Sequence, residues 1–268
     1  MKLRWRDELR VALCPERVLA VRYRRGNGNR VADTSHIIIA SDAGAPRWKA
    51  AIAGLHRVLA SPLAHAADLS VVLSSHFVRY AVLPWTAALR GEAEWLKYAR
   101  HVLFTTYRQP ALSWNVGMCG TGFRKPRIAC GVEAELVTAI AGVASERGMR
   151  LISLQPYLVS SFNRLHGRLR ERKSWLALLE GSRLTLCAFD GERWSGIHSR
   201  ASNGRWDETL RQLVAGAGQL GGVAPPTSIA LCGDQPIEPS RLGQIELADM
   251  TVPRGAPPAL QPFALALA

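Results

Sequence analysis

The chain has 268 residues, of which 48% are hydrophobic and 21% charged, and its formal net charge is +13. This length suits one large domain or two closely packed lobes with a sizeable core, and the hydrophobic content excludes a disordered chain. Because no apolar run approaches the roughly 20 residues that cross a bilayer, the sequence predicts no membrane-spanning helix. The N-terminus alternates charged and apolar residues and lacks the apolar region of a signal peptide.

The basic charge and the cysteines narrow the class of protein further. Most of the basic residues are arginines that are scattered along the chain, with short clusters at 22–25 and 164–173. Contact with an anionic membrane surface and simple surface solvation both remain open, whereas no nucleic-acid-binding motif is present. The five cysteines are odd in number and form no CxxC pair, which favours buried, reduced thiols over a zinc site or disulfides.

The first part of the chain predicts three strands, a helix and a fourth strand. Alternating and β-branched residues indicate the strands, and Pro15 marks a tight turn between the first two. Apolar residues at helical spacing follow Pro46, a residue that is favoured at the start of a helix. The expected elements are strands at 11–14, 17–24 and 36–40, a turn at Gly26–Gly28, a helix that begins at Pro46, and a buried strand at 69–73.

The middle of the chain predicts additional elements. A glycine at 148 is a common stop signal for the helix before it. The expected elements are a strand at 78–83, a helix at 92–107, strands at 112–118 and 126–131, a helix at 133–147, a strand at 151–154 and a helix at 156–170.

The order strand–strand–strand–helix–strand then recurs. Aligning Arg17 with Arg183, and Val71 with Ile229, brings similar residues together in the two copies. The second copy is expected to have strands at 175–180, 183–189 and 193–199, a helix at 205–219 capped by Asn203, and a strand at 227–231. The tail after about 250 is rich in proline and alanine, so we expect it to be loosely held.

This duplicated order, with a strand–helix–strand–strand insertion in the first copy, resembles the actin-like (ribonuclease H-like) α/β fold. The insertion is similar to the small subdomain of the bacterial branch that includes PilM and FtsA. The segment LSSHFVRYAVLPW at 73–85 is also similar to a strand pair in PilM, MshI and the cytoplasmic part of GspL. The resemblance implies a first lobe at 1–75 and 132–172, an inserted subdomain at 76–131, a second lobe at 173–250 and a tail at 251–268.

The resemblance also implies a function. PilM, MshI and GspL assemble type IV pili or type II secretion systems at the inner membrane, so we expect a non-catalytic scaffold that is cytoplasmic and peripheral to that membrane. A PilN-like peptide of an inner-membrane partner is expected in a groove between the first lobe and the insertion, lined by Arg79, Tyr80 and Trp85. An anionic membrane surface and a homodimer remain open as further partners, and nucleic acid is not expected.

The nucleotide site of an actin-like ATPase is degenerate in this sequence. Such a site needs an Asp for the Mg²⁺ water shell and Gly so that backbone N–H groups approach the phosphates. The turn Cys14–Arg17 offers neither, and Pro15 removes an N–H donor. Vestigial cofactor-binding residues are Glu180, Gly181, Ser182 and Gly233.

We therefore expect no catalytic residues, no metal site and no cofactor. The alternative is an active or nucleotide-binding actin-like ATPase or kinase that binds ATP and magnesium. Neither a Walker A sequence nor HExxH, GxSxG or GxGxxG is present, and no two of the seven histidines have ligand spacing on a helix.

Overall fold

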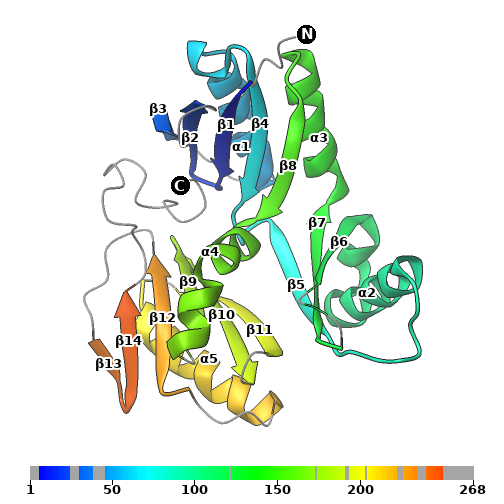
Figure 1. The fold of residues 1–268 in the computed structure, drawn as a ribbon, viewed down its shortest axis with the longest axis vertical. Helices are drawn as coiled ribbons and strands as arrows, with labels where there is room; N and C mark the ends of the chain where they lie inside the picture. The colour runs from blue at the N-terminus through cyan, green and yellow to red at the C-terminus, as the bar shows by residue number, and fades with distance from the viewer. Residues whose placement is uncertain are drawn as a thin grey trace.

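Three β-sheets and the helices that connect their strands make up the described part of the chain (Figure 1). The structure is a computed structural model, and it describes residues 6–24, 30–38, 46–120, 122, 124–172, 174–190, 193–202, 204–221, 226–233 and 240–249. No helix within these ranges is long and apolar enough to cross a membrane. The turn predicted at Gly26–Gly28, the cap predicted at Asn203 and the tail at 251–268 lie outside the described residues.

The first sheet has five strands in the order β3-β2-β1-β4-β8. The strands are β1 (Asp7–Leu13), β2 (Arg17–Arg24), β3 (Arg30–Ile38), β4 (Ala67–Leu73) and β8 (Leu151–Pro156). The first three form an antiparallel meander, whereas β4 and β8 run parallel to β1. Every residue of β4 is buried, as expected of a parallel strand whose two faces are both covered.

The start predicted for the third strand, residue 36, is wrong, because β3 begins at Arg30, whereas the predicted residues 39 and 40 lie outside the described residues. β3 lies at the edge of the sheet and has only β2 as a neighbour. An edge strand tolerates polar residues such as Asp33, Thr34 and Ser35. Because these residues are polar, a prediction based on alternating apolar residues does not detect the first half of the strand.

The helices of this part are α1 (Arg47–Leu59), α3 (Ala134–Glu146) and α4 (Tyr157–Arg172), with the short 3₁₀ helix η1 (Pro62–Ala64). α1 packs against α3, and α4 leads from the first sheet to the other large sheet (Figure 1). α3 ends just before Gly148, whose φ of 62° is the left-handed conformation that glycine adopts without strain.

The small sheet has the strand order β5-β7-β6, and all of its pairs are antiparallel. Its strands are β5 (Val78–Leu83), β6 (Trp114–Gly120) and β7 (Arg127–Glu133), and its helices are α2 (Glu92–Tyr107) and the 3₁₀ helix η2 (Gln109–Ser113). α2 buries Trp95, Ala99 and Leu103 in a core of its own. The strand predicted to begin at 112 begins at Trp114, because η2 occupies the preceding residues.

The second large sheet has six strands in the order β11-β10-β9-β12-β14-β13. Its elements are β9 (Trp175–Glu180), β10 (Arg183–Asp190), β11 (Arg193–Ala201), α5 (Trp206–Gly221), β12 (Ser228–Gly233), β13 (Ser240–Leu242) and β14 (Ile245–Asp249). The sequence did not predict β13 and β14, whose 3 and 5 residues are too few to show a clear alternation.

The strand pairs show which residues of the two large sheets occupy equivalent positions. Leu13 pairs with Val18 across the first hairpin, and Leu179 pairs with Leu184 across the second. These pairs fall in the register that aligns Arg17 with Arg183. Because Leu9 pairs with Leu69 and its counterpart Trp175 pairs with Ile229, Leu69 is the true counterpart of Ile229. The alignment of Val71 with Ile229 was therefore wrong by two residues, a shift that keeps the same strand face.

Candidate functional site

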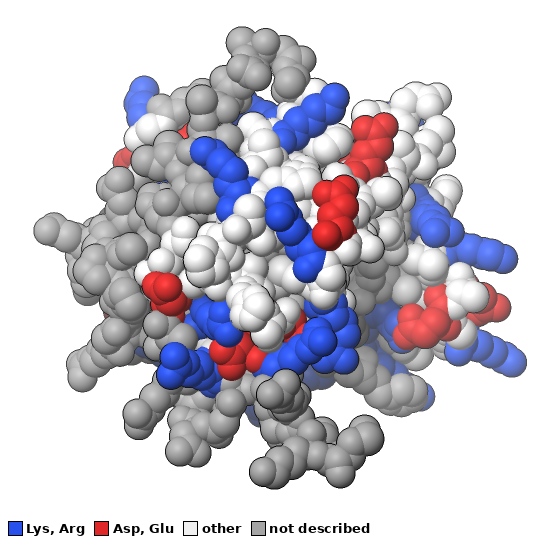
Figure 2. Space-filling model, turned by 90° about the horizontal axis from the view of Figure 1, so that it is seen from above, with Lys and Arg blue, Asp and Glu red and all other residues white. Residues whose placement is uncertain are grey.

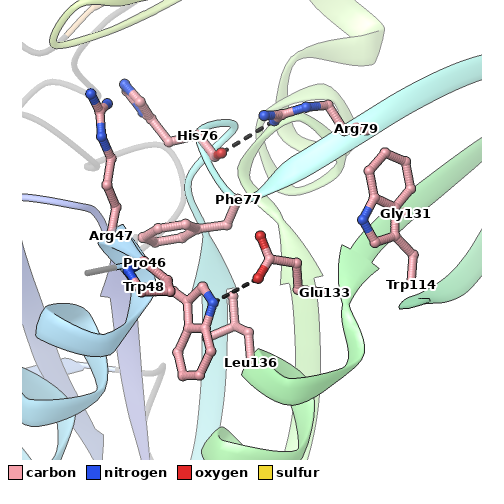
Figure 3. Close-up of a pocket in the computed structure, with 10 residues that line it drawn as sticks. All are labelled: Pro46, Arg47, Trp48, His76, Phe77, Arg79, Trp114, Gly131, Glu133 and Leu136. Atoms are coloured by element: carbon pink, nitrogen blue, oxygen red, sulfur yellow. Dashed lines mark hydrogen bonds between the residues drawn. The ribbon is translucent and has the colours of Figure 1, made fainter. Parts of the chain in front are cut away.

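A pocket of about 210 Å³ lies where α1, the turn after β4, the small sheet and the start of α3 meet (Figure 3). We call it the aromatic pocket. It is lined by Pro46, Arg47, Trp48, His76, Phe77, Arg79, Trp114, Gly131, Glu133 and Leu136. Its walls thus come from both the first-sheet part of the chain and the small sheet.

Two residues far apart in the sequence hold one wall of the aromatic pocket together. The Trp48 indole Nε1 donates a hydrogen bond of 2.7 Å to the Glu133 carboxylate, as Figure 3 shows. Trp48 lies in the first turn of α1, and Glu133 ends β7 just before α3 begins. This bond ties α1 to the small sheet, and it leaves the carboxylate exposed at the pocket.

The opposite wall depends on a glycine in the middle of β7. A Cβ atom at Gly131 would lie 2.4 Å from Cε3 of the Trp114 ring, which is closer than real Cβ atoms approach. The missing side chain therefore lets the Trp114 ring lie against the strand. The ring of Trp114 also packs against Tyr107, with 5.3 Å between ring centroids.

His76 lines the aromatic pocket in an environment that favours its neutral form. Its Nδ1 is 3.0 Å from the Ser74 hydroxyl. Burial, followed by the charges of Arg183, Arg47 and Arg79, lowers the pKa of His76 to about 4. The imidazole is therefore neutral near pH 7. Figure 3 shows the Arg47 and His76 side chains extending in the same direction.

Glu180 forms a contact between the two large-sheet parts of the chain. Its side chain is buried at the end of β9. The carboxylate accepts hydrogen bonds from the Ser74 hydroxyl at 2.6 Å and from the Ser75 backbone N–H at 3.0 Å. Ser74 in turn extends the first sheet, since its N–H donates to the Leu13 carbonyl at 2.9 Å.

The other predicted cofactor residues lie close to Glu180. Gly181 has a φ of 55°, which suits a tight turn, and the Ser182 carbonyl accepts a hydrogen bond from the Ser202 N–H at 2.8 Å. Gly233 ends β12 and lies opposite Leu179 of β9. The structure thus brings Glu180, Gly181, Ser182 and Gly233 to one end of the second sheet. Within the described ranges, no three His, Cys, Asp or Glu side chains gather as metal ligands.

Of the three predicted groove residues, the structure places Arg79 at the aromatic pocket and the other two elsewhere. Tyr80 is only 4% exposed, and burial is the main cause that raises its pKa. Trp85 follows β5 and is 39% exposed, with the Arg124 guanidinium 5.7 Å from its ring centroid.

The sequence reading missed most of the pocket's lining. In the sequence, Trp48 is one of the apolar residues of the helix predicted to begin at Pro46, and Glu133 is only the first residue of the helix predicted at 133–147. The isolated Gly131 within a strand was the available signal, since such a glycine indicates the close approach of another group.

A solved structure decides the fold. A protein of Bacteroides thetaiotaomicron with an actin-like ATPase fold and unknown function matches 85% of this chain and 82% of its own, with a TM-score of 0.60 and 14% identity. This chain has the actin-like ATPase fold. The cytoplasmic domain of EpsL, an inner-membrane component of the Vibrio cholerae type II secretion system, matches 97% of this chain and 94% of its own, with a TM-score of 0.59 and 13% identity.

The PilM–PilN type IV pilus biogenesis complex also has a similar fold, with a TM-score of 0.52 and 12% identity over 80% of this chain and 66% of that one. The predicted resemblance to PilM and to the cytoplasmic part of GspL is therefore confirmed at the level of the fold. No protein-family model and no curated protein sequence matches the chain.

Proposed function

We propose that this chain is a non-catalytic scaffold protein on the cytoplasmic side of an inner-membrane assembly complex of the pilus or type II secretion kind. It binds a peptide segment of a PilN-like partner protein in the aromatic pocket. The first lobe would span 1–75 and 132–172, the insertion 76–131 and the second lobe 173–250.

The aromatic pocket is the observation that carries the proposal. Trp48, Phe77 and Trp114 offer apolar ring surface for a partner's side chains, and Arg79 and Glu133 offer charged groups beside them. Buried aromatic and arginine anchors are typical of protein-binding sites. The similarity of fold to PilM in a complex with PilN supports a peptide as the occupant.

The chemistry of the two hairpin turns supports a non-catalytic role. In the register of the hairpins, Cys14 is the counterpart of Glu180, and Pro15 is the counterpart of Gly181. The Cys14 N–H donates to the Arg17 carbonyl at 3.0 Å, so this donor is already used within the turn. Glu180 accepts hydrogen bonds from two serines of the turn after β4 and would have to leave them to organise the water shell of Mg²⁺.

On the face shown in Figure 2, the distribution of charge favours a partner protein, rather than the membrane itself, as the link to the bilayer. Figure 2 shows one face of the molecule, on which the described Lys and Arg side chains lie singly or in small groups with Asp and Glu among them. Electrostatic binding to anionic lipid is strongest where basic residues are clustered.

Peptide selection on the purified chain tests the proposal. We would select peptides from a random display library and measure their affinity by fluorescence anisotropy for wild type, Phe77→Ala and Phe104→Ala. Phe77 lines the aromatic pocket, whereas Phe104 is an exposed residue of α2 and serves as the matched control. We expect Phe77→Ala to weaken binding about tenfold and Phe104→Ala to leave it unchanged.

Two results would contradict the proposal. One is that no selected peptide distinguishes Phe77→Ala from Phe104→Ala. The other is micromolar binding of Mg-ATP by calorimetry together with hydrolysis, which would favour the ATPase alternative.

A further inference from the structure

Three arginines from three parts of the chain lie near enough to His76 for their charges to lower its pKa. Arg47 begins α1 and Arg79 lies on β5, and both line the aromatic pocket. Arg183 begins β10 directly opposite Glu180, whose carboxylate binds Ser74 and Ser75, the two residues before His76. We call Arg47, Arg79 and Arg183 the arginine cluster.

The charges of the cluster act on one another. Burial is the largest cause that lowers the pKa of His76, and the charges of all three arginines lower it further. Burial also lowers the pKa of Arg183, and Arg79 and Arg47 lower it further, while Glu180 raises it. Cations gathered in a partly buried site repel each other, and an anion placed among them would relieve that repulsion.

No member of the cluster forms an ion pair within the described part of the chain. Arg79 donates to the backbone carbonyls of His76 and Val78, at 3.2 and 3.0 Å. Arg183 donates through one terminal nitrogen to the Ser199 hydroxyl at 3.0 Å. Its Nε is buried and has no hydrogen-bond partner in the described structure, and such a donor is costly to leave unpaired.

The two carboxylates of this region are already engaged. Glu180 is bound by Ser74 and Ser75, and Glu133 accepts the indole N–H of Trp48 on another wall of the aromatic pocket. The cluster therefore offers guanidinium groups that can receive a carboxylate from outside, and arginine is well suited to bind one through two parallel hydrogen bonds.

We propose that the arginine cluster binds the side-chain carboxylate of an aspartate or glutamate in the partner peptide, next to apolar residues that occupy the aromatic pocket. This inference rests on the proposed peptide-binding function and adds the chemical class of the partner. Because Arg183 belongs to the second large sheet, the acidic residue would join that sheet to the inserted strands. The partner is thus an acidic-apolar segment, which matches the +13 net charge of the chain.

The lining of the pocket favours a peptide carboxylate over a polyphosphate. Glu133 is exposed on the same pocket and would repel a ligand with several negative charges. The rings of Trp48, Phe77 and Trp114 offer apolar contacts that inorganic phosphate cannot use.

Paired peptides test the inference. Each selected peptide that contains one acidic residue would be compared with its amide twin, Asp→Asn or Glu→Gln, on wild type, Arg47→Gln, Arg183→Gln and Arg100→Gln. Arg100 is an exposed residue of α2 outside the pocket, so this control removes the same charge elsewhere. Thermal melting checks that every variant is folded, and Arg47→Gln changes an exposed side chain.

We expect the acidic peptide to bind wild type about tenfold more tightly than its amide twin. This ratio should fall to about twofold in Arg47→Gln and Arg183→Gln and remain unchanged in Arg100→Gln. The preference should also weaken at high salt, since part of it is electrostatic.

The possible failures are distinguishable. If both twins bind wild type equally and still depend on Phe77, the peptide function stands and the inference is wrong. If no peptide is selected, both are wrong. If inorganic phosphate or Mg-ATP displaces the acidic peptide at micromolar concentration and loses that ability in Arg183→Gln, the cluster is a phosphate site and the inference is overturned.

Discussion

Replacing Glu180 tests how the two large-sheet parts are held together. The residue is 2% exposed, and its carboxylate accepts hydrogen bonds from the Ser74 hydroxyl and the Ser75 N–H. Truncation to alanine would leave these donors without their acceptor, and a buried unpaired donor costs about 1–3 kcal/mol. The Ser74 hydroxyl can turn to Nδ1 of His76, 3.0 Å away, so the Ser75 N–H carries most of the loss.

We therefore expect Glu180→Ala to reduce the free energy of unfolding by about 2–3 kcal/mol. The substitution also removes the desolvation cost of one buried charge. This gain partly offsets the lost hydrogen bonds and keeps the loss of stability near this range. Glu180→Gln retains one acceptor oxygen and similar volume, and it should lose about half as much. Urea unfolding followed by the fluorescence of the 8 tryptophans measures these differences.

Glu146→Ala is the control for removing a carboxylate. Glu146 is 65% exposed and lies 3.9 Å from Nδ1 of His56, so its loss should change stability by less than about 0.5 kcal/mol. If Glu180→Ala is as stable as this control, the contact with the serines is not structural. If wild type binds Mg-ATP and Glu180→Ala does not, the residue serves a nucleotide site and the reasoning above is wrong.

Three further predictions concern single residues. Gly131→Ala should destabilise the chain by about 1–3 kcal/mol and change the fluorescence of the displaced Trp114, and an unchanged melting temperature would contradict the close packing. Folding lowers the pKa of His76 from 6.5 to about 4. As pH falls, His76 is therefore protonated in the unfolded chain before it is protonated in the folded chain. Stability should therefore fall as pH decreases from about 6.5 towards 4, by at most about 3 kcal/mol relative to His76→Gln, and a His76 resonance that titrates near pH 6.5 would refute this. A hydrogen bond with Cys130 lowers the pKa of Cys119 to about 7, so Ellman's reagent should modify one thiol fastest at neutral pH, and Cys119→Ser should remove that phase.

The element order could be predicted from the sequence because each element carries a local signal. Apolar alternation marks the strands, helical spacing marks α1 and α2, and the recurrence of the whole order indicates duplication. β13 and β14 are too short for such a signal, and the polar start of β3 lacks it. The two-residue error at β4 arose because a uniformly apolar strand gives no unique register, and only pairing with β1 fixes it.

The pocket could be predicted only in part because it depends on contacts between distant segments. Trp48 and Glu133 are 85 residues apart, and neither side chain reveals in the sequence that it meets the other. Trp114 and Gly131 lie on neighbouring strands in a register that only pairing reveals. Arg79 was predicted through the family resemblance, whereas Arg183 was not, because its place beside His76 follows from the contact of Glu180 with another sheet.

The turn from Ser74 to Arg79 connects the features described above. Its serines hold Glu180 of the second sheet, His76 lies among the arginine cluster, and Phe77 and Arg79 line the aromatic pocket. In an actin-like ATPase, a bound nucleotide joins the two lobes through its phosphates. Here the Glu180 carboxylate contacts the turn after β4 directly and so joins the second sheet to the first. A peptide bound beside this turn would then meet a preorganised surface, and preorganisation favours affinity because less entropy is lost on binding.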